Sequence, residues 1–153
     1  MIKEITYQFK VNWVLKNKLA IGNAPLNKEN FKHLKALNFK SIINLCSEEE
    51  CSTPKGISSD FIFKRIFIPD HSFKESIKIE QINNVLVILD ELLTKGSVFI
   101  HCRAAVERSP LICMAWLIKN KNLSINEALN YLMIVNKGSC PLKKELDLLK
   151  EIK

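Results

Sequence analysis

A cysteine, an arginine and a serine hydroxyl gather in the short segment 101–110. Cys102 follows an apolar run, five residues separate it from Arg108, and Ser109 comes next. A loop that enters a helix N-terminus turns backbone N–H groups and the positive end of the helix dipole toward one point, where phosphate binds. The same field stabilises a thiolate, and the arginine fork matches two oxygens of one phosphate. We therefore expect a nucleophile, Cys102, inside a phosphate-binding loop.

The elements on either side of this segment give it the geometry that the chemistry needs. Residues 97–100 form an apolar run that predicts a buried strand, and residues 110–120 are apolar nearly all round, which is typical of a buried helix. Ser109 is a suitable N-cap and Pro110 a suitable first helical residue. A lone cysteine is more often a small core residue. Here, however, the strand before it, the helix after it, the N-cap and the arginine all favour a nucleophile in an anion-binding loop.

The remaining pattern predicts alternating strands and helices. Continuous apolar strands between amphipathic helices are typical of an α/β fold around a central, mostly parallel sheet flanked by helices. Ligands bind such sheets beyond the carboxyl ends of the strands, which is where Cys102 falls. We expect strands at 13–15, 19–21, 39–45 and 61–68, a loop at 48–59, and helices starting after Asn27 and at 76–93, 124–135 and 142–152.

Length and composition favour one compact domain, residues 1–153. The chain is 47% hydrophobic and 25% charged, with four glycines and five prolines, which excludes a disordered or low-complexity protein. The five cysteines contain no CxxC pair, so a zinc ribbon or thioredoxin motif is excluded. Met1 is not followed by the apolar segment of a signal peptide, and no run is long enough to span a membrane. We expect a cytoplasmic protein with reduced thiols.

The numbers of basic and acidic residues indicate which class of molecule the protein binds. The formal net charge is +7, which favours phosphate groups, nucleic acid or anionic membranes alike. Only three of the 23 basic residues are arginine, and two of these, Arg103 and Arg108, flank the segment after Cys102. This concentration favours one phosphate-sized anion, and we expect no nucleic acid partner.

At these residues the sequence resembles a known family. His101-Cys102-x5-Arg108-Ser109 looks like the signature of the cysteine-dependent protein phosphatases, specifically the small dual-specificity phosphatases. Residues 19–24, which end in Gly-Asn-Ala, residues 42–45 and residues 115–117 resemble further parts of that family, so that about residues 10–150 are covered. The resemblance implies a dual-specificity phosphatase-like α/β fold and a reaction that needs no metal or cofactor.

The resemblance also implies a role for each residue of the loop. Cys102 would attack phosphorus, Ser109 would donate to the departing sulfur, and His101 would support the loop by hydrogen bonding. In several relatives a second cysteine near the position of Cys46 forms a reversible disulfide with the nucleophile; an inert thiol is the alternative. The phosphate would be bound by the backbone and side chains of Arg103, Ala104, Ala105, Val106, Glu107 and Arg108.

Asp70 is the candidate general acid. It follows the strand at 61–68 directly after Pro69, and it lies 32 residues before Cys102, the spacing that the family uses. Without the family resemblance, the Pro-Asp pair is as typical of an ordinary turn or helix cap as of a general acid. His71 is either a second proton donor or a solvated side chain.

Two positions depart from the family pattern. The family has glycine where this chain has Ala105, because the loop often needs φ > 0, and an alanine there costs about 1–2 kcal/mol. The family has a small or neutral residue at Glu107, and we expect this carboxylate to point outward and pair with a lysine. A Glu-Arg ending is also similar to cell-cycle phosphatases of the rhodanese fold, but the Gly-Asn-Ala element and the terminal helices argue against that fold.

The sequence thus predicts a monomeric phosphatase that hydrolyses phosphotyrosine or phosphoserine/phosphothreonine in proteins through a phosphocysteine. One alternative is a non-protein substrate, either a phosphoinositide or an RNA 5′ phosphate. Lipid-acting relatives usually carry lysines inside the loop, and this loop has none. The other alternative is a catalytically weak protein that binds phosphate without turnover.

Overall fold

The computed structural model describes residues 7–152 as one five-stranded sheet between two layers of helices. Residues 1–6 and 153 of the predicted domain lie outside the described residues. The strand order is β1-β2-β5-β3-β4. Three of the four pairings are parallel and only β1 with β2 is antiparallel, which confirms the mostly parallel sheet. The strands are β1 (Val11–Leu15), β2 (Leu19–Gly22), β3 (Ser41–Asn44), β4 (Ile62–Arg65) and β5 (Val98–His101).

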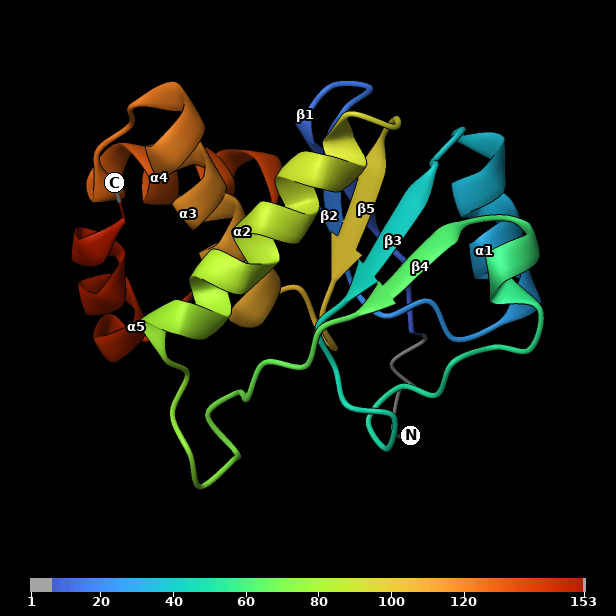
Figure 1. The fold of residues 1–153 in the computed structure, drawn as a ribbon, viewed down its shortest axis with the longest axis horizontal. Coiled ribbons are helices and arrows are strands. Elements are labelled where there is room, and N and C mark those ends of the chain that lie inside the picture. The colour runs from blue at the N-terminus through green and yellow to red at the C-terminus, as the bar shows by residue number, and fades with distance from the viewer. Residues whose placement is uncertain (1–6, 153) are drawn as a thin grey trace, which may run out of the picture.

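Helices cover both faces of this sheet. Helix α1 lies on one side of it, and α2 to α5 lie on the other (Figure 1). None of the helices within the described residues is long and apolar enough to cross a lipid bilayer. The helices are α1 (Lys28–Ala36), α2 (Ile79–Leu93), α3 (Arg108–Lys121), α4 (Ile125–Val135) and α5 (Lys143–Leu148), with short 3-10 turns at Ile57–Ser59 and Leu149–Glu151.

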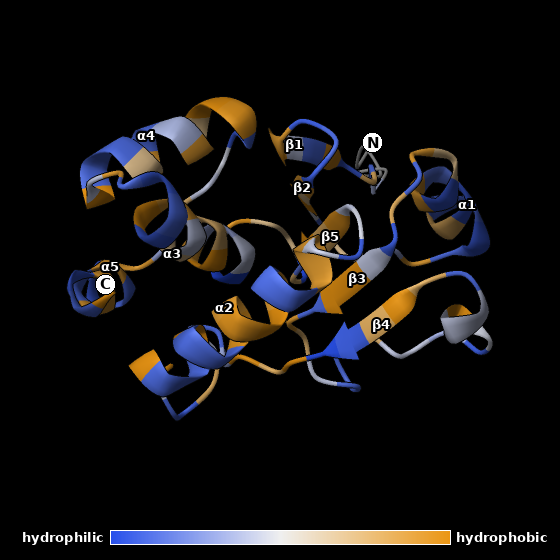
Figure 2. Cartoon of the chain, turned by 45° about the horizontal axis from the view of Figure 1, so that its top comes forward, coloured by the Kyte–Doolittle hydropathy of each residue, from blue (hydrophilic) through white to orange (hydrophobic). Residues whose placement is uncertain are grey.

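The alternation of side chains along the central strands divides the core in two. Ile43 and Ile100 point to the side of α2 and α3 and join the larger cluster, whereas Ile42 and Phe99, one residue away, join the smaller cluster on the side of α1. Figure 2 shows β3 and β5 as mostly hydrophobic ribbons between the two layers. Because both faces are covered, these strands are continuously apolar rather than alternating.

Local signals set most helix starts. Asn27 accepts a hydrogen bond from the Asn30 N–H (2.9 Å), and Ser124 and Glu127 form the expected capping box. Helix α2 was expected from Ser76 but begins at Ile79, because the Lys78 N–H is taken by the Gln81 side chain (2.8 Å).

The start of α3 was also predicted wrongly. The sequence favoured Ser109 as N-cap and Pro110 as the first helical residue, but the helix begins at Arg108 and its N-cap is Glu107. Pro110 is then the third helical residue, a place where its missing N–H costs nothing because the first turn has no intrahelical acceptors. The helix therefore starts two residues earlier than expected and takes Arg108 into its first turn.

Candidate active site

The carboxyl ends of three parallel strands bring the candidate residues together. β3, β4 and β5 point to the same edge of the sheet (Figure 1). Cys102 follows β5 directly, Cys46 lies two residues beyond β3, and Asp70 lies five residues beyond β4. A surface pocket of about 480 Å³ opens at this edge, a size typical of ligand sites. It is lined by Asp70, His71, Cys102, Arg103, Ala104, Val106, Glu107, Arg108, Cys140 and Leu142.

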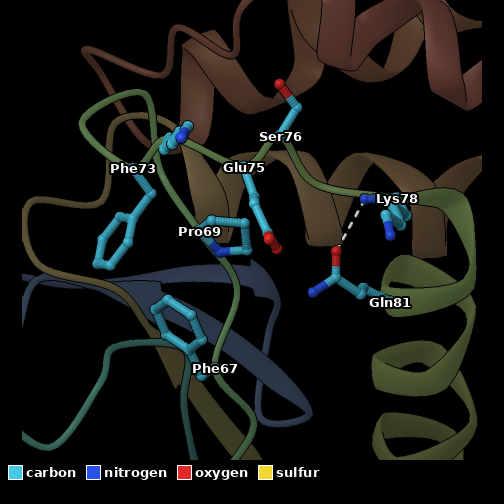
Figure 3. Close-up of a pocket in the computed structure, with 8 residues that line it drawn as sticks. Phe67, Pro69, Phe73, Glu75, Ser76, Lys78 and Gln81 are labelled. Atoms are coloured by element: carbon cyan, nitrogen blue, oxygen red, sulfur yellow. Dashed lines mark hydrogen bonds between the residues drawn. The ribbon is translucent and has the colours of Figure 1, made fainter.

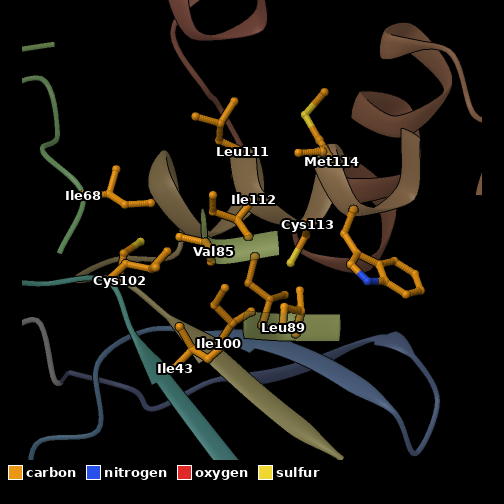
Figure 4. Close-up of a cluster of buried hydrophobic side chains, with 14 of the residues drawn as sticks. Ile43, Ile68, Val85, Leu89, Ile100, Cys102, Leu111, Ile112, Cys113 and Met114 are labelled. Atoms are coloured by element: carbon orange, nitrogen blue, oxygen red, sulfur yellow. The ribbon is translucent and has the colours of Figure 1, made fainter. Parts of the chain in front are cut away.

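Cys102 lies at the boundary between core and pocket. It is 3% exposed and belongs to the larger hydrophobic cluster, where Figure 4 places it at the edge, near Ile68. The same residue lines the pocket. The thiol thus has apolar neighbours on the inner side and an opening toward solvent on the other.

The loop after Cys102 presents its backbone N–H groups inward. The carbonyl of Arg103 accepts from the Ala24 N–H (3.1 Å), that of Ala105 from the Asn136 side-chain amide (2.9 Å), and that of Val106 from the Cys140 N–H (2.7 Å). In a trans peptide the N–H points opposite to the carbonyl, so the following N–H groups face away from these outer partners. Within the described chain, no N–H from residue 103 to 107 donates to a protein acceptor. Unsatisfied N–H groups around one point form an anion-binding site.

Ala105 makes this curvature possible at a conformational cost. Its φ is 58°, as the sequence predicted for the position where the family has glycine. A non-glycine residue in this left-handed region costs about 1–2 kcal/mol. The hydrogen bond from Asn136 to its carbonyl stabilises the turn. Asn136 also accepts from the Asn12 side chain, and the sequence analysis did not identify it.

Arg108 is buried and held by a carboxylate that the sequence analysis missed. It is 2% exposed, and Glu50 binds both of its terminal nitrogens, Nη2 at 2.8 Å and Nη1 at 3.1 Å. Nη1 also donates to the Ile68 carbonyl (3.1 Å). Although burial raises the pKa of Glu50, its hydrogen bonds from Arg108 and the Ser47 N–H lower it below the usual value overall. The Nε–H of Arg108 makes no hydrogen bond to another described residue.

Arg65 shapes the loop that carries Glu50. Its guanidinium donates to the carbonyls of Cys46 and Cys51 (2.7 Å each) and to the Thr53 hydroxyl (2.8 Å). The residues from 46 to 53 therefore curl around one arginine. Arg65, the one arginine that lies far from Cys102 in the sequence, therefore serves this loop and not the pocket.

Asp70 lies at the rim of the pocket, beside Arg108. The distance from Asp70 Oδ2 to Arg108 Nη2 is 3.7 Å, and Asp70 Oδ1 accepts from the N–H (2.8 Å) and hydroxyl (2.5 Å) of Ser72. Burial raises the pKa of Asp70, but the Ser72 hydrogen bonds and the charges of Arg108 and His71 outweigh it and hold the pKa below its usual value.

Glu107 does not point outward to a lysine, as the sequence analysis expected. It is 9% exposed and its Oε2 lies 2.7 Å from His71 Nδ1. Its Oε1 is buried without a hydrogen-bond partner among the described residues, and Glu145 of α5, another buried carboxyl, lies close to Glu107. The prediction was wrong because its partners, on distant segments, offer it an ion pair inside the fold. Asp70, His71 and Glu107 place one ligand atom each within 4.8 Å of one another, so they are the residues that could hold a divalent cation.

The other predicted residues lie around the loop. His101 is buried, and its Nδ1 lies 3.0 Å from the Cys102 carbonyl oxygen. Burial lowers the pKa of His101 to about 4, so the ring is neutral and donates this bond. Ser109 is fully buried and its hydroxyl has no hydrogen-bond partner among the described residues. Cys46 lies 3.9 Å from Arg108 Nη2, and burial raises its pKa to about 12.

Comparisons with known proteins point to one family. The family model for the catalytic domain of dual specificity phosphatases matches residues 20–151. The chain is 30% identical to dual specificity protein phosphatase 1-B of Xenopus laevis over 99 residues, which are 64% of this chain and 25% of that protein. It is 51% identical to dual specificity protein phosphatase 5 of Rattus norvegicus over 37 residues, 24% of this chain and 10% of the relative. The chain thus spans a quarter or less of the length of these relatives.

Solved structures share the fold. Tk-PTP in its active form superposes with a TM-score of 0.79 at 21% identity, covering 93% of this chain and 95% of that one. The human tyrosine phosphatase-like serine/threonine/tyrosine-interacting protein gives a TM-score of 0.77 at 19% identity, covering 92% and 93%. With a family model that covers most of its length, the chain belongs to the dual specificity phosphatase family and carries the catalytic domain of that family.

Proposed function

We propose that this protein hydrolyses phosphomonoesters on protein side chains, with Cys102 as the nucleophile. The observation that carries the proposal is the loop from 103 to 107, whose free N–H groups face one point beside Cys102 and Arg108. Such a loop is suited to the three equatorial oxygens of a phosphoryl group in transfer.

The first step would transfer the phosphoryl group to the protein. The Cys102 thiolate attacks phosphorus, an S–P bond forms, and the P–O bond to the substrate side chain breaks. Asp70 in its acid form gives its proton to the leaving oxygen, which departs as a neutral hydroxyl. Arg108 has its Nε–H and the second N–H of Nη2 for two phosphate oxygens, while Nη1 and the first N–H of Nη2 remain with Glu50 and Ile68.

The second step would release phosphate. The Asp70 carboxylate takes a proton from water as the water oxygen attacks phosphorus, the S–P bond breaks, and inorganic phosphate leaves. The uncommitted hydroxyl of Ser109 is available to donate to the departing sulfur. One water is consumed per ester, Cys102 and Asp70 return to their starting states, and no metal or cofactor takes part.

Phosphoproteins are the proposed substrates because the named relatives are protein phosphatases. A phosphoinositide is the second class to test, since a structure with the same fold, PTPMT1, is described in complex with PI(5)P. The absence of lysine from the loop disfavours such a lipid. We also propose that the protein is cytoplasmic and monomeric, and both of these proposals come from the sequence.

The test compares substrates that differ in leaving group. Asp70→Asn is expected to lower kcat for a phosphotyrosine peptide about 100-fold or more, because phenolate is a poor leaving group, and to change hydrolysis of p-nitrophenyl phosphate far less. Asp60→Asn, at the opposite end of β4, is the matched control. Equal losses on both substrates would remove Asp70 as the acid, and preferential turnover of PI(5)P over phosphopeptides would replace the substrate class.

A further inference from the structure

His71 and Glu107 join the segment that carries Asp70 to the loop that binds phosphate. His71 directly follows Asp70, and Glu107 directly precedes Arg108. His71 Nδ1 lies 2.7 Å from Glu107 Oε2, and the His71 backbone N–H lies 3.4 Å from the same oxygen. One carboxylate oxygen thus contacts both the ring and the main chain of the residue next to Asp70.

The burial of Glu107 makes this contact energetically significant. The Glu107 side chain is 11% exposed, whereas that of His71 is 68% exposed. A carboxylate withdrawn from water is costly unless it is paired and hydrogen-bonded. The Glu107 hydrogen bond and charge, followed by the charge of Asp70, raise the pKa of His71 and so favour the imidazolium that pairs with it.

A second buried carboxyl supports Glu107 from the C-terminal helix. Glu145 is 2% exposed, and its Oε1 accepts from the Leu142 N–H (2.7 Å). Burial, and then the proximity of Glu107, raise the pKa of Glu145 to about 7. In its acid form Glu145 can donate to Glu107 Oε1. Lys144, whose Nζ donates to the Ser76 hydroxyl (3.1 Å), is a cation near Glu145, and its charge lowers the pKa of that carboxyl.

The Asp70 segment has few other attachments to the phosphate-binding loop. Its base is held by the Ile68 N–H to the Leu45 carbonyl (3.0 Å) and by the edge-to-face pair of Phe67 and Phe73, 5.1 Å between ring centroids (Figure 3). Phe67 and Ile68 precede Asp70 in the chain and Phe73 follows it, so neither contact involves Asp70 itself. Among the described residues, the polar links from Asp70 and His71 to the loop are the 3.7 Å approach to Arg108 and the His71–Glu107 pair.

We infer that His71 and Glu107 are positioning residues: Glu107 holds His71, and His71 fixes the neighbouring Asp70 carboxyl beside Arg108, in the pocket that Cys102 also lines. This inference rests on the proposed function, in which Asp70 protonates the leaving oxygen. The pair also accounts for a carboxylate next to the arginine that binds phosphate, because the His71 imidazolium offsets the charge of Glu107. Loss of the pair would displace the acid and leave the nucleophile and the N–H groups in place.

The test measures kcat and KM with phenyl phosphate, which needs protonation of its leaving oxygen, and with p-nitrophenyl phosphate, which does not. His71→Ala is expected to lower kcat for phenyl phosphate about 10- to 100-fold, the effect of displacing a catalytic group by about 1 Å. For p-nitrophenyl phosphate kcat and KM stay within about threefold of the parent. His71→Asn keeps an N–H donor near the position of Nδ1 and is expected to restore most of the lost rate.

A double-mutant cycle separates positioning from a general structural role. In an Asp70→Asn background the acid is already absent, so adding His71→Ala is expected to cause no further loss. Glu107→Gln keeps an acceptor oxygen for His71 without the charge and should reduce the phenyl phosphate rate less than His71→Ala does. His33→Ala, an exposed histidine on α1, is the matched control and should behave as the parent.

The outcomes separate this inference from the proposed function. Equal losses on both substrates, no loss on phenyl phosphate, or a further loss in the Asp70→Asn background would each overturn the positioning role while leaving Cys102 chemistry intact. A parent protein that hydrolyses neither substrate, or a Cys102→Ser variant with full activity, would overturn the proposed function and the inference with it.

Discussion

Arg108 and Glu50 form a two-pronged ion pair at the base of the proposed phosphate-binding loop, with Nη2–Oε1 at 2.8 Å and Nη1–Oε2 at 3.1 Å. The arginine is 2% exposed and the carboxylate side chain 20% exposed. A guanidinium fixed at two points presents its remaining N–H groups in one direction, which suits bidentate recognition of phosphate. Glu50 therefore determines which edge of Arg108 faces the pocket.

Glu50→Ala is expected to damage both stability and activity. It leaves the buried Arg108 charge without its main partner, so the free energy of unfolding should fall by about 2–4 kcal/mol, and kcat/KM should fall about 10-fold or more. Urea unfolding and hydrolysis of p-nitrophenyl phosphate measure the two effects. Glu49→Ala, on the exposed neighbouring residue, is the control and should change the free energy of unfolding by less than about 0.5 kcal/mol. A Glu50→Ala variant as stable and active as this control would show that the pair is dispensable.

Ser72 should set the pH range in which Asp70 acts as an acid. Its hydrogen bonds favour the carboxylate, so the protonated acid is lost as pH rises through a pKa that lies below the usual value. For phenyl phosphate, kcat/KM is therefore expected to decrease on the alkaline side. Ser72→Ala removes the hydroxyl donor, raises the pKa of Asp70 and should move this limb to higher pH. This decrease of kcat/KM on the alkaline side should be absent in Asp70→Asn and unchanged in Ser58→Ala. A Ser72→Ala pH profile identical to that of the parent would contradict the role of Ser72.

Ala105→Gly tests the strain stored in the loop. Glycine adopts φ near 58° without steric cost, which relieves about 1–2 kcal/mol. This gain is opposed by the lost methyl burial and by the greater freedom of the unfolded chain, about 0.4–1 kcal/mol. We expect a variant at least as stable as the parent in urea unfolding, with activity retained. Ala104→Gly, at an exposed position without positive φ, should instead lose about 0.5–1 kcal/mol. Greater destabilisation by Ala105→Gly than by Ala104→Gly would contradict the strain argument.

The disulfide between Cys46 and Cys102 stays a prediction. All five cysteines are free thiols in the structure. If Cys46 protects the nucleophile, peroxide should inactivate the parent reversibly, with most activity recovered by dithiothreitol, whereas Cys46→Ser should lose activity irreversibly. Cys51→Ser, a buried neighbour on the same loop, is the matched control. Equal recovery in the parent and in Cys46→Ser would show that Cys46 is an inert thiol.

Contiguous features were predictable from the sequence and long-range pairings were not. Cys102 and Arg108 belong to one short segment whose strand, loop and helix can be recognised locally, and the structure brings them to the pocket that they line. Glu50 stands in a run of three acidic residues within a polar loop, so it looked like an exposed residue. Its partner lies 58 residues away, and only the fold brings the two together.

The same reason explains the wrong prediction for Glu107 and the omission of Asn136. A carboxylate beside the phosphate-binding arginine was expected in solvent, because neither His71 nor Glu145 is near it in the sequence. Asn136, at the end of α4, carries no local sign that its amide binds the Ala105 carbonyl. The start of α3 was misplaced because capping preference alone favoured Ser109, whereas the N-cap in the structure is Glu107, two residues earlier.

The most direct test of the account is steady-state hydrolysis of p-nitrophenyl phosphate by the parent protein and by Cys102→Ser, each checked for folding by circular dichroism. This substrate needs no general acid, so the measurement depends on the nucleophile and on the groups that bind the phosphate, and not on Asp70. We predict turnover by the parent without added metal and a loss of about 1,000-fold or more in Cys102→Ser. Comparable turnover by the two proteins would contradict the central claim that Cys102 carries the phosphoryl group.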